Sequence, residues 1–401
     1  MKVGTVRFSR ARPDFPVSFE YDPTWVKKTC GFLLDPRLEL FAGEQHPPAN
    51  ATTFGILKDA APDRWGRLLM ERREGILARK DGRKARRLGE MDFLLGVHDL
   101  ARPGALRFRS NSGGQYLDDS KELAAPPVTS LRELAQASQK IAEPDADEST
   151  EAERWLATLL VPGTSLGGAR PKTSFAETDG SLWFGKFPSR EDRYDVGAWE
   201  LVVHQLAQDA KVDVPQARLE RLTDRYSTFC VARFDRAGNR RRMFASAMTL
   251  LDRHDGDVGA SYVDLAELIA NHGASGHIEE DLGQLFRRVV FNVLVSNRDD
   301  HLLNYGFLRT RAGWRLAPAY DMNPSLDKQE HVFTLDDASA EPCVDTVVET
   351  AEFYRLTTTE AAAIFSQVRV AVDGWRAKAK FIGLSRAEVQ RMESAFATWT
   401  D

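Results

Sequence analysis

The chain has 401 residues, of which 42% are hydrophobic and 28% are charged, and its formal net charge is −5 at pH 7. This composition is typical of a folded globular protein and excludes an intrinsically disordered chain. The negative charge argues against a protein that coats nucleic acid over its whole surface. Cys30, Cys230 and Cys343 stand too far apart for a zinc motif or a disulfide framework. Since no apolar run reaches the roughly 18 to 20 residues of a membrane-spanning helix, we expect a cytoplasmic protein without a membrane partner.

The N-terminal third predicts a mixture of strands and helices. Hydrophobic and polar residues alternate over residues 1–20, which indicates strands. Near Gly55–Ile76 the pattern predicts a helical stretch with Trp65, Leu68, Leu69 and Ile76 roughly on one face. The polar, glycine-containing stretch from Ser110 to Pro127 predicts a loop and a domain boundary.

Capping boxes mark several helix starts further along the chain. Each pairs a Ser or Thr with a Glu three residues later: Ser130 with Glu133, Thr150 with Glu153, Thr357 with Glu360, and Ser385 with Glu388. Residues 162–236 read as loop, strand, helix and strand, and the chain after Arg240 reads as mainly helical. Within that part, hydrophobic residues of 282–294 recur at helical spacing, which predicts an amphipathic helix.

Three polar residues after this helix have the spacing of a phosphoryl-transfer site. Asn304 follows Asp299 by five positions, and Asp321 comes seventeen positions later. Phosphoryl transfer needs a carboxylate to position the acceptor hydroxyl and oxygen ligands for Mg²⁺. Protein kinases use Asp-x-x-x-x-Asn in one loop and a metal-binding Asp after the next hairpin. In this chain the strand-like segments GFL (306–308) and WRLAP (314–318) would form that hairpin. Taken singly, Asp299 or Asn304 is more often a turn or cap residue, so the prediction depends on the motifs upstream.

Upstream, two elements fit the binding of phosphates. The stretch PGTSLGGARPK contains Ser165, Gly167 and Gly168, and such a turn lets backbone N–H groups approach an anion. A hairpin turn is the alternative. Lys186 lies between aromatic residues in a predicted strand, as does the kinase lysine that pairs with ATP phosphates. The alternative is a lysine that extends along an edge strand into water.

The segment VARFDR, with Arg233 and Phe234, follows as a connection between two lobes where backbone groups would meet adenine. This order of motifs is that of a kinase. It predicts an α+β, protein-kinase-like two-lobed fold with an N-terminal α/β subdomain and a mainly helical C-terminal lobe. The predicted domains are residues 1–115 (N-terminal subdomain), 116–240 (ATP-binding part) and 241–401 (helical catalytic lobe).

These motifs resemble those of the HipA-type serine/threonine kinases, the toxins of bacterial HipA–HipB toxin–antitoxin pairs. The similar stretches are DAAPDRWGRLLMER (59–72), MDFLLGVHDLARPGALRF (91–108), SLGGARPK (165–172), VARFDR (231–236), NRDDHLLNYGF (297–307) and AYDMNPS (319–325). They extend over nearly the whole chain, including the N-terminal subdomain that these proteins add to the kinase core.

The resemblance implies roles for individual residues. Asp299 would be the catalytic base, Asn304 and Asp321 would bind Mg²⁺, and Lys186 would hold the phosphates of ATP. His301 would lie beside the nucleotide.

The resemblance also implies a modification and partners. Ser165 would be autophosphorylated. The target would be a protein serine, with an aminoacyl-tRNA synthetase as the expected substrate. The partner would be a HipB-like helix-turn-helix antitoxin, and DNA would be bound only through the antitoxin complex.

Two alternative functions stay open at this point. A small-molecule kinase would use the same Asp–Asn–Asp arrangement, and a catalytically weak corepressor would act only with a DNA-binding antitoxin. The basic run from Arg79 to Arg87 is either a solvated surface or a contact for DNA phosphates or an acidic partner.

Overall fold

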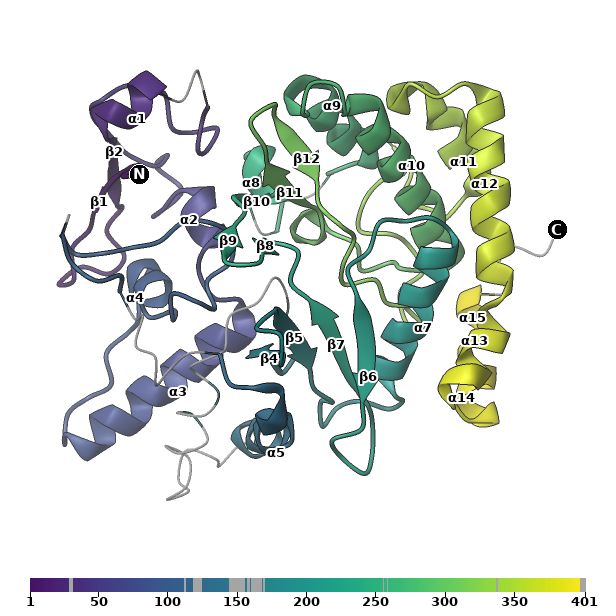
Figure 1. The fold of residues 1–401 in the computed structure, drawn as a ribbon, viewed down its shortest axis with the longest axis horizontal. Coiled ribbons are helices and arrows are strands. Elements are labelled where there is room, and N and C mark those ends of the chain that lie inside the picture. Colours follow the sequence, from purple (N-terminus) through teal and green to yellow (C-terminus); the bar gives the residue numbers. More distant parts are fainter. Residues whose placement is uncertain are drawn as a thin grey trace. The chain divides into compact units, whose positions relative to one another are not determined.

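The computed structural model describes most of the chain (Figure 1). The described residues are 1–28, 32–111, 113–117, 125–143, 156, 159, 168, 170–254, 256–257, 259–336 and 338–396. They form two compact units: unit 1 is Met1–Phe175 with Met248–His254, and unit 2 is Ala176–Ala247 with Asp255–Asp401. In the described parts, no helix combines the length and the apolar character needed to span a membrane. The predicted domain limits at residues 115 and 240 stay predictions.

Unit 1 combines a small sheet with helices. Its antiparallel strands have the order β1-β2-β3 and are β1 (Gly4–Arg7), β2 (Ser18–Tyr21) and β3 (Glu44–Gln45). Its helices are α1 (Pro23–Lys28), α2 (Gly55–Asp59), α3 (Arg64–Lys80), α4 (Glu90–Leu95), the 3₁₀ turn η2 (Val128–Ser130) and α5 (Leu131–Ile141). The mixture of strands and helices predicted for the N-terminal part is confirmed.

The helical stretch predicted near Gly55–Ile76 is confirmed, but it consists of two helices, because the chain breaks between α2 and α3. Trp65, Leu69 and Ile76 are buried as predicted, whereas the prediction for Leu68 is wrong, because its side chain is 37% exposed. Pro62 lies in the break, where it has no N–H to continue the helical hydrogen bonds. Asp63 then starts α3 as its N-cap, with its carboxylate accepting a hydrogen bond from the backbone N–H of Gly66 at 2.9 Å. The helix therefore restarts inside the predicted span.

The predicted capping boxes have different outcomes. Thr357 and Glu360 form a complete box at α12, and Ser385 accepts from the N–H of Glu388 at α14. Ser130 makes no capping hydrogen bond, because the 3₁₀ turn η2 leads directly into α5. The box predicted at Thr150 and Glu153 lies outside the described residues.

Three further sheets follow along the chain. The four-stranded sheet has the order β4-β5-β7-β6, and its strands are β4 (Lys172–Ala176, at the boundary of the units), β5 (Leu182–Lys186), β6 (Ala217–Glu220) and β7 (Thr228–Ala232). A hairpin of β8 (Arg236–Ala237) and β9 (Arg240–Arg241) follows. The three-stranded sheet has the order β10-β11-β12, with β10 (Phe244–Ser246), β11 (Gly306–Arg309) and β12 (Trp314–Leu316). The pair β11–β12 is the hairpin that the sequence predicted before Asp321.

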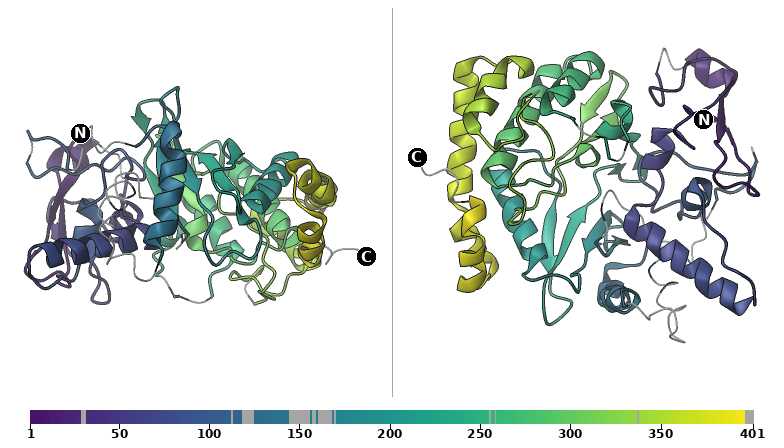
Figure 2. Two further views of the ribbon diagram at one scale, coloured as in Figure 1. Left: turned by 90° about the horizontal axis from the view of Figure 1, so that it is seen from below. Right: turned by 180° about the vertical axis from the view of Figure 1, so that it is seen from behind.

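Helices make up most of the second half of the chain. They are α7 (Val196–Asp209), α8 (Ala247–Leu250, at the unit boundary), α9 (Tyr262–His272), α10 (Ile278–Leu294), η4 (Leu302–Asn304), α11 (Val344–Glu349), η5 (Thr350–Tyr354), α12 (Thr358–Asp373), α13 (Trp375–Ile382), α14 (Arg386–Arg391) and α15 (Glu393–Phe396). Within unit 2, α12 to α15 form an outer layer, and α7 and α10 lie between that layer and the sheets (Figures 1 and 2). The amphipathic helix predicted over 282–294 is the larger part of α10.

The helix α7 is buried on almost all sides. It packs on β6 and β7 and on α12 and α13. Ten of its fourteen residues are buried: Gly197, Ala198, Trp199, Glu200, Leu201, Val202, Val203, His204, Leu206 and Ala207. A helix that is hydrophobic all round belongs in a core, and α7 forms the centre of unit 2.

Candidate functional site

Lys186 connects two carboxylates at the end of β5. Its Nζ lies 2.5 Å from Oε1 of Glu200 on α7 and 2.7 Å from Oδ1 of Asp321. The exposed fractions of the three side chains are 12%, 5% and 29%. Burial alone would lower the pKa of Lys186, but the charges of Asp321 and Glu200 outweigh it and raise the pKa above its ordinary value. The lysine is therefore a fixed cation between two anions.

Glu200 was not among the residues that the sequence predicted for the site. The only indication of its role in the sequence is that it is a single acidic residue within the otherwise apolar helical segment VGAWELVV (196–203). A buried carboxylate needs a partner, because an unpaired charge in a core is very unfavourable. The sequence does not say which lysine or arginine supplies that partner.

Asp321 has a backbone conformation that side chains rarely adopt. Its φ is 59°, in the left-handed region, where a non-glycine residue is held only by its surroundings. The neighbouring residues provide this support. The hydroxyl of Tyr320 donates to the carbonyl of Leu303 at 2.7 Å, and the N–H of Asn323 donates to Oδ1 of Asn297 at 3.3 Å. These bonds tie the Asp321 loop to the loop that contains Asp299 and Asn304.

Asn304 presents a buried oxygen without a hydrogen-bond donor. Its Nδ2 donates to the backbone carbonyl of Asp299 at 3.3 Å, whereas its Oδ1 is buried and has no partner among the described residues. Oδ1 of Asn323, beside Asp321, is likewise buried and has no hydrogen-bond partner among the described residues. The described residues hold no group of three or more His, Cys, Asp or Glu side chains suited to a metal. Amide oxygens beside one carboxylate fit Mg²⁺, which takes few protein ligands and completes its shell with phosphates and water.

Asp299 differs from these residues in its exposure. Its side chain is 65% exposed and forms an ion pair with Lys328. An exposed carboxylate on the loop of Asn304 is accessible to a substrate hydroxyl.

The carboxylate of the next residue, Asp300, points into the core. Its Oδ2 accepts hydrogen bonds from the hydroxyls of Tyr262 and Tyr305, both at 2.8 Å, and from Nδ2 of Asn292 at 2.7 Å. Burial raises the pKa of Asp300 to about 6, although these bonds favour its charged form. The network anchors the loop of Asp299 to α9 and α10. The sequence interpretation did not single out Asp300.

The residues predicted to face the nucleotide are placed differently from one another. Phe234 stacks on Tyr320, with ring centroids 5.5 Å apart, so it lies beside the Asp321 loop. Arg233 is committed to a buried ion pair with Asp235 at 2.7 Å. His301 precedes η4 and has a buried Nδ1 without a hydrogen-bond partner in the described part of the chain. His301 therefore belongs to the loop of Asp299 and Asn304, and Phe234 packs against the Asp321 loop from the segment after β7. The Arg233 guanidinium already has a structural partner.

Comparison with known families identifies the chain at this point. Residues 164–375, more than half of the chain, match the model of the family described as the HipA-like C-terminal domain.

The chain belongs to the HipA-like family.

The chain is also similar to individual proteins. A Haemophilus influenzae protein named "Putative kinase" is 28% identical to this HipA-like chain over 181 residues, which are 40% of this chain and 52% of that protein. The chain thus spans about half the length of the curated relative it matches. A chain in the solved complex of Shewanella oneidensis MR-1 HipA, HipB and operator DNA superposes with a TM-score of 0.68 at 16% identity. The superposed region includes 98% of this chain and 93% of the chain from the complex. This similarity confirms the predicted HipA-type, kinase-like α+β fold.

The glycine-rich turn of the HipA-like chain is described only in part. Ser165 and Gly167 lie outside the described residues. Gly168 has a φ of 83°, a conformation that glycine adopts without strain. Its carbonyl accepts from Nζ of Lys172 at 3.5 Å, and the same Nζ lies 3.0 Å from Asp63. The end of the turn is thereby anchored within unit 1.

Three arginines of the basic run Arg79–Arg87 form ion pairs within unit 1. The pairs are Arg83 with Glu74 at 2.5 Å, Arg86 with Asp92 at 2.9 Å, and Arg87 with Asp14 at 3.1 Å. These contacts favour the solvated-surface interpretation over a DNA contact, because the guanidinium charges are already balanced.

Proposed function

We propose that this HipA-like chain is an ATP-dependent serine/threonine protein kinase. The observation that carries the proposal is the ion pair of Lys186 with both Glu200 and Asp321. In protein kinases a strand lysine pairs with a glutamate of the neighbouring helix, and the metal-binding Asp lies beside them. The strand β5, the helix α7 and the loop after β12 supply these three residues in the same chain order.

The roles of the residues follow from their positions. Mg²⁺, when bound, neutralises charge on the phosphates of ATP, and Asn304 and Asp321 would hold it. Lys186 would place a cation on the phosphates. Asp299 would accept the proton of the acceptor hydroxyl, because its carboxylate is exposed on the loop that also carries Asn304.

We also assign contacts to the nucleotide. They come from the glycine-rich turn, the connecting segment and the catalytic loop: Ser165, Gly167, Gly168, Arg233, Phe234 and His301. For Arg233 we expect the contact through its backbone, because its side chain pairs with Asp235.

A kinase assay tests this function. The purified chain with Mg²⁺ and γ-labelled ATP should transfer label to proteins of a bacterial lysate, and Asp299→Asn should abolish the transfer. Asp373→Asn, at an exposed position at the end of α12, is the matched control and should keep full activity. Label that appears only on small molecules would favour a small-molecule kinase. Transfer that persists in Asp299→Asn would remove Asp299 from the catalytic role.

We propose further that the kinase is the toxin of a HipA–HipB-like pair in the cytoplasm. Support comes from membership in the HipA-like family and from the fold shared with the Shewanella complex of HipA, HipB and operator DNA. The partner would be a HipB-like helix-turn-helix antitoxin, which alone would contact DNA, and the substrate would be an aminoacyl-tRNA synthetase. Expression of the wild-type chain alone should arrest bacterial growth, whereas Lys186→Ala should be tolerated. Equal toxicity of the two would separate growth arrest from kinase activity.

Autophosphorylation of Ser165 is part of this proposal. A phosphate adds about −1.5 to −2 charges at neutral pH, so in a turn that faces ATP it would repel the nucleotide. Incubation with Mg²⁺ and ATP followed by mass spectrometry should locate phosphate on Ser165, and the isolated phosphoprotein should bind ATP more weakly. An active kinase with unmodified Ser165 would contradict the site, and unchanged ATP affinity of the phosphoprotein would contradict the inhibition.

A further inference from the structure

A lysine of the loop after β12 contacts the carboxylate that we assign as the base. Nζ of Lys328 forms an ion pair with Oδ1 of Asp299, 29 positions away in the chain. Asp327 and Glu330 lie closer to Lys328 in the sequence, but neither forms an ion pair with it in the described structure. Oδ2 of Asp299 has no partner among the described residues. The pair therefore occupies one oxygen of Asp299 and leaves the other for a substrate.

Hydrogen bonds hold the start of this loop against the loop of Asp299. The N–H of Ser325 donates to the carbonyl of Ser296 at 2.8 Å. The guanidinium of Arg298, the residue before Asp299, is buried and donates through Nη1 to the carbonyl of Lys328. Its Nη2 also donates to Oγ of Ser296 at 3.4 Å. Lys328 and Asp299 are thus brought together by anchored main chain and not only by their own charges.

The far end of the same loop is packed into the core. Phe333 is buried, and its ring centroid lies 4.9 Å from that of Tyr262 and 5.9 Å from that of Tyr305. The N–H of Tyr262 donates to the carbonyl of Thr334 at 3.1 Å. The hydroxyls of the same two tyrosines hold the carboxylate of Asp300, the residue after Asp299. The lysine is therefore carried on a loop that is fixed at both ends.

We propose that Lys328 is a positioning residue for phosphoryl transfer, whose ammonium holds Oδ1 of Asp299 so that Oδ2 meets the acceptor hydroxyl. The proposal rests on the kinase function proposed above. In that reaction the acceptor oxygen bonds to the γ-phosphorus of ATP, the bond from this phosphorus to the ADP oxygen breaks, and Oδ2 takes the acceptor proton. Catalysis of this transfer depends mainly on the orientation of the acceptor and on positive charge nearby. Lys328 supplies orientation through Asp299 and adds a positive charge.

The same contact would be a restraint if the substrate had to displace the lysine at a large cost. The side chains of Lys328 and Asp299 are 45% and 65% exposed, and ion pairs between exposed groups are weak because water screens them. Such a pair cannot keep a substrate away from Asp299. It can orient the carboxylate, because the anchored main chain on both sides lowers the entropy cost of holding the two side chains together. Removal of Lys328 should therefore slow the transfer rather than accelerate it.

Initial rates of label transfer from γ-labelled ATP to proteins of a bacterial lysate, measured against ATP concentration, test this role. Lys328→Met should lower the rate at saturating ATP at least about tenfold, as for a misplaced catalytic group, and should leave the KM for ATP within about twofold. Lys328→Arg keeps a cation and should recover a large part of the rate. Arg355→Met is the matched control, because it breaks an ion pair of similar exposure, with Glu279, and it should transfer label at the wild-type rate.

The outcomes separate this inference from the function on which it rests. A wild-type chain that transfers no label contradicts the kinase function, and the inference falls with it. If the wild type is active, the inference alone is wrong when Lys328→Met transfers label at the wild-type rate or faster, when Arg355→Met loses as much, or when the loss appears only in the KM for ATP. Thermal unfolding should give nearly the same midpoint for all four proteins, since both pairs are exposed. A lowered midpoint in Lys328→Met alone would make the pair structural and would also contradict the inference.

Discussion

Nζ of Lys186 and Oδ1 of Asp321 lie 2.7 Å apart, although 135 positions separate the two residues in the chain. The contact joins the end of β5 to the loop after β12. With Glu200 on α7, it gives one cation two anionic neighbours in a largely buried place. Removal of the cation therefore affects folding as well as chemistry.

Lys186→Met should destabilise the chain, because it removes the cation that pairs with the carboxylates of Glu200 and Asp321. Loss of one partner of a buried ion pair typically costs about 3–5 kcal/mol in the free energy of unfolding. The double variant Lys186→Met/Glu200→Gln should recover part of this loss, since it also removes the more buried of the two carboxylate charges and leaves only that of Asp321. Urea denaturation measures both effects, and a double variant no more stable than Lys186→Met would contradict the pairing.

Asp299→Ala and Asp321→Ala should each reduce phosphoryl transfer by about 100-fold or more, for different reasons. Loss of Asp299 removes the group that orients the acceptor and should leave the affinity for Mg²⁺–ATP intact. Loss of Asp321 removes a metal ligand and should lower that affinity. Calorimetry distinguishes the two, and equal binding defects would refute the division of roles.

Asp300→Asn should change how stability depends on pH. The pKa of Asp300 is about 6 in the folded chain and near 3.8 when unfolded, so between these values the folded chain binds more protons. Its contribution to the free energy of unfolding therefore falls as pH rises through this window, by about 3 kcal/mol at most. His204, whose burial lowers its pKa to about 4, acts in the opposite direction and is present in both proteins. The difference between wild type and variant from pH 4 to pH 7 isolates Asp300, and a constant difference would disprove the assignment.

Gly197→Ala should destabilise unit 2, although alanine favours helices. A Cβ at Gly197 would lie 2.5 Å from the carbonyl oxygen of Ser227 and 3.2 Å from the N of Phe229. Both are backbone atoms, so the clash can be relieved only by a shift of the main chain. Such overpacking costs about 1–3 kcal/mol. Gly283→Ala on α10 is the control, because no atom lies within 4 Å of its Cβ, and it should gain about 0.5–1 kcal/mol. Thermal unfolding of the two variants should show shifts of opposite sign.

The sequence predicted those parts of the site that local spacing determines. Asp299 and Asn304 share one loop. The hairpin predicted between Asn304 and Asp321 brings the Asp321 loop back beside that loop. Periodicity predicted the helices and strands, and the order of the motifs along the chain predicted the fold class.

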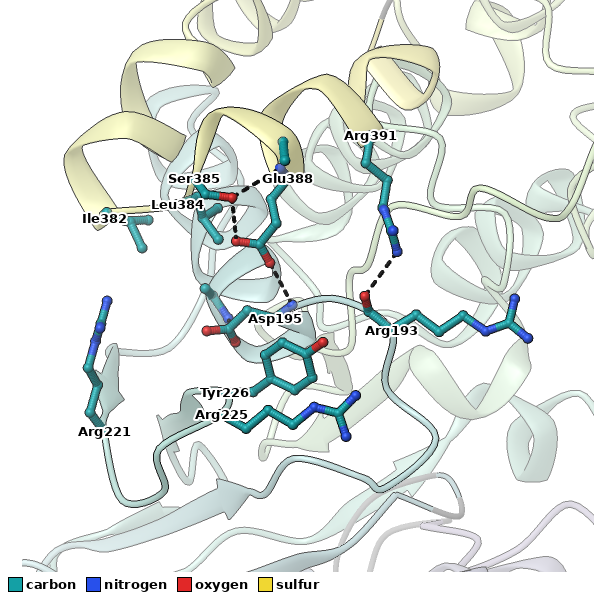
Figure 3. A pocket seen from close by; sticks show the side chains of 13 residues that line it. Arg193, Asp195, Arg221, Arg225, Tyr226, Ile382, Leu384, Ser385, Glu388 and Arg391 are labelled. Atoms are coloured by element: carbon teal, nitrogen blue, oxygen red, sulfur yellow. Dashed lines mark hydrogen bonds between the residues drawn. The ribbon is translucent and has the colours of Figure 1, made fainter.

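The remaining features depend on contacts between distant segments. The sequence around Glu200 shows only a charged residue in an apolar helix, since its partner Lys186 lies on the strand β5. Arg391 donates a hydrogen bond to the carbonyl of Arg193, 198 positions earlier in the chain (Figure 3), and no local sequence pattern predicts that contact. The break before Asp63 was missed because the hydrophobic periodicity of the segment outweighed the signal of Pro62.

The burial of α7 has a consequence for how the proposed kinase could be controlled. In regulated protein kinases the position of the helix that carries the glutamate is a control point. Here the residues around Glu200 are enclosed by two strands and two helices, so an outward swing of α7 would expose Trp199, Val202 and Val203 to water. Such a loss of apolar burial, at roughly 1.5–3 kcal/mol for each large side chain, makes a displaced helix a rare state. The Lys186–Glu200 pair is accordingly permanent rather than switchable, and any restraint on this protein has to act on its loops or come from another molecule.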